Sequence, residues 1–218
     1  MISIDNSVEL MIKTYLGLPK RITGLAISRK EFDEISESFP ALLDALEKYA
    51  SVKLEGVDLG AIEWYHRLRN QLYHQGNGLT VERDKVDVYA QLANVLFKNL
   101  FGSDLIEDFP KAANLLGEFI ESWATLEKRL NEASPPTSAA RAMLGVPYIV
   151  MDLRKADLLK AEDVARFDAL RKIRNEIVHG AVDHKAILTP ARIRELKDLI
   201  ERVSKSTGAS AAGAGPAL

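Results

Sequence analysis

Two stretches of this chain, Trp64–His74 and Ala169–His179, share one layout, and this repeat constrains the fold more than any other feature of the sequence. Each stretch contains the pattern Arg-Asn-x-x-x-His. Because the chain has only four histidines, a histidine at the same offset in both copies is hard to attribute to chance. The repeat predicts two related halves, with the motifs about 105 residues apart. The repeated residues are Arg69, Asn70, His74, Arg174, Asn175 and His179.

Both stretches have the periodicity of amphipathic helices. Apolar residues recur at spacings of three and four before each motif histidine, and a glycine follows each histidine closely. The aligned apolar positions are Tyr65, Leu68 and Leu72 in the first copy, and Leu170, Ile173 and Ile177 in the second. The same spacing recurs along the rest of the chain, and no segment alternates convincingly with period two. The sequence therefore predicts an all-α fold with almost no strand.

Capping residues, prolines and glycines locate the ends of the expected helices. Asn6 or Ser7 is the expected cap of the first helix, Ser28 with Glu31 forms a capping box, and Asp58 caps the first motif helix. A threonine, Thr80 or Thr189, is expected to cap the helix after each motif. The expected helices are 6–16, 28–39, 40–49, 58–74, 80–101, 110–130, 138–144, 147–156, 161–178 and 189–203.

Composition supports a packed globular chain. With 218 residues of which 47% are hydrophobic, the chain is long enough for one large or two small domains, and the repeat divides it into halves at 1–104 and 105–205. A Gly-, Ala- and Ser-rich tail, 206–218, is expected to be disordered. No apolar run is long enough for a membrane span, the N-terminus lacks a signal-peptide layout, and cysteine is absent. We therefore expect a cytoplasmic protein without disulfides or thiolate chemistry.

The motif residues suit chemistry on a phosphodiester. On a helix, the Asn and the His of each motif are four residues apart and share a face. Each histidine lies in the last turn of its helix, where the dipole favours the imidazolium form. Histidine can move protons near neutral pH, and arginine can hold a phosphate and stabilise the charge that develops when a ribose 2′-hydroxyl attacks. No metal-binding, nucleoside-triphosphate or serine-hydrolase motif is present, so we expect no metal or cofactor.

The doubled motif resembles the Arg-x4–6-His motif of HEPN domains, which are small all-α bundles. The resemblance spans most of residues 5–204, and it implies two tandem HEPN-like helical bundles that pack as a pseudo-twofold dimer within one chain. It implies a metal-independent endoribonuclease, of the toxin or defence type, in which both motifs form one composite site. It also implies RNA as a partner, with an antitoxin or regulatory protein and a second copy of the chain as further candidates. Gly76 and Ala181 stand where many HEPN toxins that are paired with nucleotidyltransferase antitoxins carry a tyrosine.

Several alternatives remain open at this stage. A basic rim for RNA could include His66, Arg67, Arg171 and Lys172, but interspersed acids fit a solvated face equally well, and the formal charge of −2 argues against indiscriminate nucleic-acid binding. Each motif arginine could instead pair with an acid such as Glu63 or Asp168 in a purely structural role. The rival function is a non-catalytic helical module that binds a nucleotide, an RNA or a protein partner. His184, in a loop, is expected to face solvent.

Overall fold

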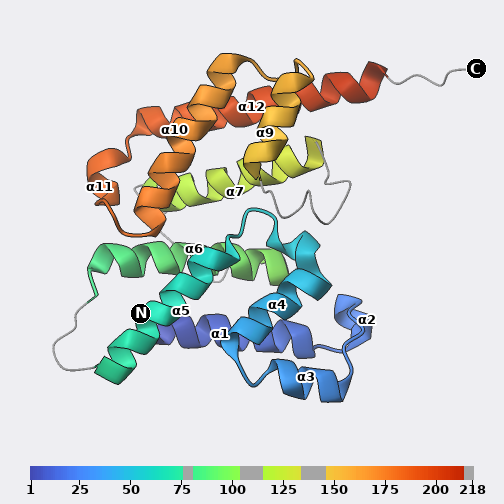
Figure 1. Cartoon of the computed structure of the whole chain (residues 1–218), viewed down its shortest axis with the longest axis vertical. Coiled ribbons are helices and arrows are strands. Elements are labelled where there is room, and N and C mark those ends of the chain that lie inside the picture. The colour runs from blue at the N-terminus through green and yellow to red at the C-terminus, as the bar shows by residue number, and fades with distance from the viewer. Residues whose placement is uncertain (76–80, 104–114, 134–145, 214–218) are drawn as a thin grey trace, which may run out of the picture. The chain divides into compact units, whose positions relative to one another are not determined.

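The computed structural model describes residues 1–75, 81–103, 115–133 and 146–213. Every regular element in these ranges is a helix, which confirms the all-α prediction (Figure 1). The chain divides into two compact units. The first comprises Met1–Lys111 together with Val178–Gly180, and the second comprises Ala112–Ile177 and Ala181–Leu218. The expectation that each half is a HEPN-like bundle stays a prediction.

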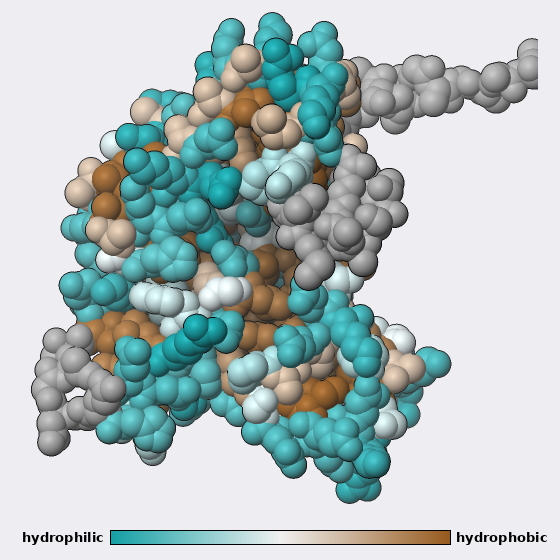
Figure 2. Space-filling model, viewed as in Figure 1, coloured by the Kyte–Doolittle hydropathy of each residue, from teal (hydrophilic) through white to brown (hydrophobic). Residues whose placement is uncertain are grey.

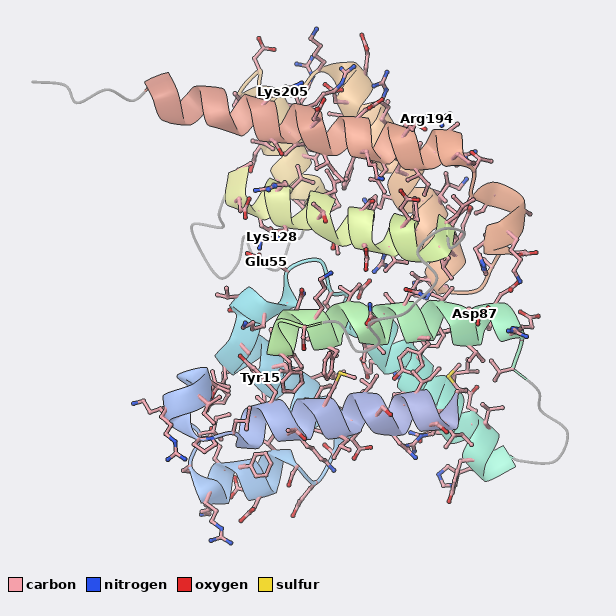
Figure 3. The ribbon with its side chains drawn as sticks, turned by 180° about the vertical axis from the view of Figure 1, so that it is seen from behind. Tyr15, Glu55, Asp87, Lys128, Arg194 and Lys205 are labelled. Carbon is pink, nitrogen blue, oxygen red and sulfur yellow. The ribbon has the colours of Figure 1, made fainter. Side chains whose placement is uncertain are left out.

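The first unit is built on a long first helix and the motif helix. Figure 1 shows α1 and α6 side by side with α5 crossing them. At one end of this pair, Tyr15 of α1 packs edge to face against Phe101 of α6, with ring centroids 5.9 Å apart (Figure 3). The helices of this unit are α1 (Ile2–Gly17), α2 (Lys20–Thr23), α3 (Arg29–Ile35), α4 (Phe39–Ala50), the 3-10 turn η1 (Ser51–Leu54), α5 (Leu59–Gln75) and α6 (Arg83–Phe101).

The second unit packs its long first and last helices against each other. Trp123 of α7 is 3% exposed and stacks on Phe167 of α10 at a centroid distance of 5.6 Å, so this tryptophan is a core residue, as its apolar register predicts. The described helices of this unit are α7 (Leu115–Ala133), α9 (Val146–Lys155), α10 (Ala161–Val178), α11 (His184–Ile187) and α12 (Pro190–Gly213). Helix α10, which carries the second motif, has the bounds that the sequence predicts.

Three predicted caps are confirmed by hydrogen bonds. Backbone N–H groups three residues on donate to Ser28 Oγ at 3.2 Å, to Asp58 Oδ1 at 3.0 Å and to Thr189 Oγ1 at 3.3 Å. Each bond satisfies one of the free N–H groups that a helix start leaves. Local side-chain chemistry therefore sets where α3, α5 and α12 begin.

Other predicted boundaries are wrong. Helix α1 begins at Ile2 after Met1, so Asn6 and Ser7 lie inside it, and α6 has Glu82 rather than Thr80 at its N-cap. Helix α12 extends through Gly213, into the segment expected to be a disordered tail, because alanine is a strong helix former and recurs there. The expected helix starts at Pro110 and 138 lie outside the described residues.

Candidate functional site

Helix α5 presents the first motif from a fixed orientation. Its start is fixed by Asp58, and the side chains of Ile62 and Tyr65 are fully buried, so one face of the helix is committed to the core. The polar face that remains carries the motif. Asn70 is half-buried, whereas His74, in the last turn, is exposed.

Four neighbouring side chains surround the guanidinium group of Arg69, and one of them, Glu9, places its Oε2 3.7 Å from Nη2. Its Nη1 donates to Asn70 Oδ1 at 2.9 Å, and its Nη2 donates to Asn6 Oδ1 at 2.9 Å. Its buried Nε lies 2.8 Å from Asp5 Oδ2, an ion pair in which the N–H group is not aimed at the carboxylate well enough to count as a hydrogen bond. The side chain is 18% exposed, so Arg69 reaches the surface while anchored to α1.

Asp5 of α1 is the centre of this arrangement, and it is fully buried. His66 Nδ1 lies 3.0 Å from Asp5 Oδ2, and Tyr89 Oη donates to Asp5 Oδ1 at 2.7 Å. Burial, with the neighbouring carboxylate of Asp5 as the next cause, raises the pKa of Tyr89 far above its usual range. The His66 ring stacks on Phe39 at a centroid distance of 3.9 Å. Motif residue Arg69 therefore belongs to a buried polar network.

The sequence prediction missed Asp5, although a signal was present. Asp5 stands three residues before Val8 and seven before Ile12, both of which are fully buried, so it occupies a core position of α1. An acid at such a position must be paired. Because the predicted helix began at Asn6 or Ser7, Asp5 was left outside it.

Helix α10 repeats the pairing of the motif arginine with the motif asparagine. Arg174 is 5% exposed, and its Nη1 donates to Asn175 Oδ1 at 3.2 Å. This bond joins the same atoms as the bond between Arg69 and Asn70 in the first unit. In both motifs, then, the asparagine orients the adjacent arginine.

Both motif histidines are exposed, at or just beyond the ends of their helices. His179 follows the last residue of α10, and it belongs to the first unit together with its neighbour Val178. Within that unit, its ring lies edge to face on Trp64 with centroids 5.7 Å apart, and Tyr65 Oη donates to Val178 O at 2.8 Å. These contacts fix the backbone on which His179 stands.

Three of the four residues expected to bind substrate are exposed, whereas the fourth, His66, is largely buried against Asp5. Arg67 is exposed and pairs with Glu63 one turn earlier on α5. Arg171 and Lys172 are exposed on α10, where Figure 2 shows a largely hydrophilic surface. Both border a hollow of about 300 Å³. Its lining is completed by Asp168, Asn175 and Glu176. The hollow adjoins a motif asparagine, but acids flank its two cations.

Two expectations need correction. In the structural alternative, the first motif arginine pairs with an acid such as Glu63. Arg69 does pair with acids, but they are Asp5 and, at 3.7 Å, Glu9, because α1 begins early enough to bring both against α5. His184 was expected to face solvent and is only 7% exposed. Its segment forms the short helix α11, which is capped by Asp183 Oδ1 and turns the ring inward.

Comparisons with protein-family models, with curated proteins and with solved structures find no match. Among the described helices, none combines the length and the apolar character that crossing a membrane would require. The resemblance to HEPN domains therefore stays a prediction from the two motifs.

Proposed function

We propose that this protein is a metal-independent endoribonuclease of the HEPN type, whose two Arg-Asn-x-x-x-His motifs act together on one phosphodiester. One observation carries the proposal: both motifs show the same local arrangement. In each, the arginine Nη1 is held by the adjacent asparagine, at 2.9 and 3.2 Å, and the histidine is exposed at the helix end. A doubled constellation of one base and one oriented cation is what an acid–base phosphodiester cleavage needs.

The proposed reaction is an internal transfer followed by departure of the 5′-oxygen. One motif histidine takes the proton of the ribose 2′-hydroxyl, and the 2′-oxygen then forms a bond to phosphorus. The bond from phosphorus to the 5′-oxygen breaks, and the other histidine donates a proton to that oxygen. The products are a 2′,3′-cyclic phosphate end and a 5′-hydroxyl end, and the arginines stabilise the extra negative charge of the transition state.

The contacts of Arg69 leave its guanidinium group able to bind a phosphate oxygen of the RNA. Each Nη atom of arginine carries two N–H groups. Among the described residues, Nη1 and Nη2 each make one hydrogen bond, and Nη2 also lies 3.7 Å from Glu9 Oε2, so Nη1 is the atom that retains an N–H for a phosphate oxygen. An arginine that is anchored before substrate binds loses little side-chain entropy on binding.

The first test uses a synthetic RNA in EDTA and compares wild type with His74→Ala, His179→Ala and the double variant. Cleavage in EDTA with a cyclic phosphate end is expected for wild type, and a matched substrate with a single 2′-deoxy nucleotide at the scissile position should resist. If the two motifs form a shared site, either single substitution should remove most of the activity. If they form two independent sites, either single substitution should remove about half of the total activity. Gln71→Ala, which removes an exposed side chain of α5 at a variable position of the motif, is the matched control. Wild-type activity in the double variant would refute the catalytic assignment.

One observation favours the rival function, a non-catalytic module that binds a nucleotide, an RNA or a protein partner. Four side chains already engage the guanidinium of Arg69, and only 18% of the side chain is exposed. This arrangement also fits an arginine that stabilises α1 against α5. Growth inhibition on expression that is relieved by His74→Ala or His179→Ala would favour the nuclease, and RNA binding without cleavage would favour the module.

A further inference from the structure

Asp5 is a buried carboxylate beside the first motif, and its burial calls for a physical explanation. Asp5 has no exposed surface, and it meets two side chains of α5, His66 at 3.0 Å and Arg69 at 2.8 Å. These two residues are three apart, so they stand on one face of the helix. The second carboxylate oxygen accepts a hydrogen bond from Tyr89, 2.7 Å away. All the partners come from α5 and α6, whereas Asp5 comes from α1.

Stability alone does not explain this arrangement. Removing a carboxylate from water is costly, and well-packed apolar residues often replace a buried ion pair without loss. What a fully buried charge with several partners does provide is a fixed geometry for those partners. The partner that reaches the surface is Arg69. Its Nη1 and Nη2 lie on the side of the guanidinium away from Nε, and Nη2 is 3.7 Å from Glu9 Oε2, so Nη1 carries the remaining N–H.

We propose that Asp5 is the positioning residue of the first motif. It forms an ion pair with Arg69 at Nε, so that Nη1 is presented to a phosphate, and it holds His66 in the form with the proton on Nδ1. Tyr89 fixes the carboxylate in turn through the oxygen that Arg69 and His66 leave free. Asp5 touches neither substrate nor reacting atoms, and it acts through Arg69. This inference rests on the proposed ribonuclease function.

The test separates positioning from folding by kinetics. In Asp5→Asn, which keeps the shape of the side chain and removes its charge, we expect kcat for RNA cleavage to fall about a hundredfold, the loss that a displaced catalytic group produces, with KM within threefold of wild type. In an Arg69→Ala background the same substitution should cause no further fall, because Asp5 acts only through Arg69. The matched control is Asp163→Asn, which removes another buried aspartate, 4% exposed and paired with Arg202 at 3.1 Å.

Two outcomes overturn the inference: a kcat for Asp5→Asn within twofold of wild type, or an equal fall in kcat when Arg69 is already alanine. If Asp5→Asn does not fold, Tyr89→Phe is the deciding variant, because it keeps the charge of Asp5 and removes the hydrogen bond to Asp5 Oδ1. A fall in kcat of threefold or more in Tyr89→Phe supports the positioning role of Asp5, and a wild-type kcat overturns it.

A second readout does not depend on ribonuclease activity. Nitrogen NMR of the His66 ring should report a proton on Nδ1 in wild type and a loss of that preference in Asp5→Asn. An unchanged tautomer would overturn the assigned role. Wild-type protein that shows this NMR signature but cleaves no RNA would defeat the proposed function and leave the geometry of Asp5 intact.

Discussion

Replacing Tyr89 with phenylalanine removes a single hydroxyl group from the interior of the first unit. Tyr89 is fully buried, and its Oη donates to Asp5 Oδ1 at 2.7 Å, so no water can take its place. A hydrogen bond to a charged group contributes about 1.5–3 kcal/mol net, and the carboxylate keeps its two other partners, so we expect a loss of about 2 kcal/mol. The stacking of the Tyr89 ring on Tyr65, 4.5 Å between centroids, is retained. For a chain of this size the loss corresponds to a fall in Tm of about 4–8 °C.

The assay is urea unfolding followed by tryptophan fluorescence. The chain has one tryptophan in each unit, Trp64 and Trp123, so a Trp123→Phe background reports the first unit alone. The matched control is Tyr15→Phe, because Tyr15 is also buried, at 5% exposed, but its ring packs on Phe101 and no hydrogen bond of its hydroxyl is found among the described residues. We expect the control to change stability by less than about 0.5 kcal/mol. An equal loss in both variants would refute the reasoning from the Asp5 network.

Three further predictions concern the first unit. Because the pKa of Tyr89 is raised, the folded protein keeps the tyrosine proton that the unfolded chain loses near pH 10, and the contribution of Tyr89 to stability is intact below that pH. Above it, the free energy of unfolding of wild type should fall faster than that of Tyr89→Phe, by up to about 1.4 kcal/mol per pH unit, in urea titrations at pH 9–11. In thermal melts, Gly180→Ala should lower Tm more than Gly24→Ala. Both glycines have positive φ (62° and 78°), which costs an alanine about 1–2 kcal/mol. Of these two, only Gly180 would also bring the new Cβ against another side chain, that of Lys85. A hydrogen bond from Tyr49, followed by one from Lys48, lowers the pKa of Glu31, so Tyr49→Phe should raise that pKa in a carboxyl NMR titration, and an unchanged value would contradict the assigned cause.

The sequence was sufficient for features that depend on nearby residues. Helix periodicity predicted the bounds of α10, and the caps at Ser28, Asp58 and Thr189 followed from side chains that reach an N–H group three residues away. The core positions Tyr65 and Leu170 followed from the three–four spacing. These features require only the local geometry of a helix.

Features that depend on tertiary packing were missed. The predicted pairing of Arg69 considered acids on its own helix, but Asp5, sixty-odd positions earlier in the sequence, is the acid that α1 brings into reach. Nothing in the spacing of the motif identifies such a partner. His184 was misplaced for a related reason: a stretch of four residues is too short for periodicity to reveal a helical turn, and its burial depends on what that turn packs against.

The discontinuity of the first unit limits how the protein can be dissected. Val178–Gly180 belong to the unit formed by Met1–Lys111, although the chain on both sides of them belongs to the other unit. A cut between the units after Lys111 would leave the N-terminal fragment without the carbonyl of Val178, the acceptor of the buried Tyr65 hydroxyl. Such a fragment would carry the whole first motif and still lack part of its own interior. The function of each half is therefore better tested by mixing the two fragments than by studying either fragment alone.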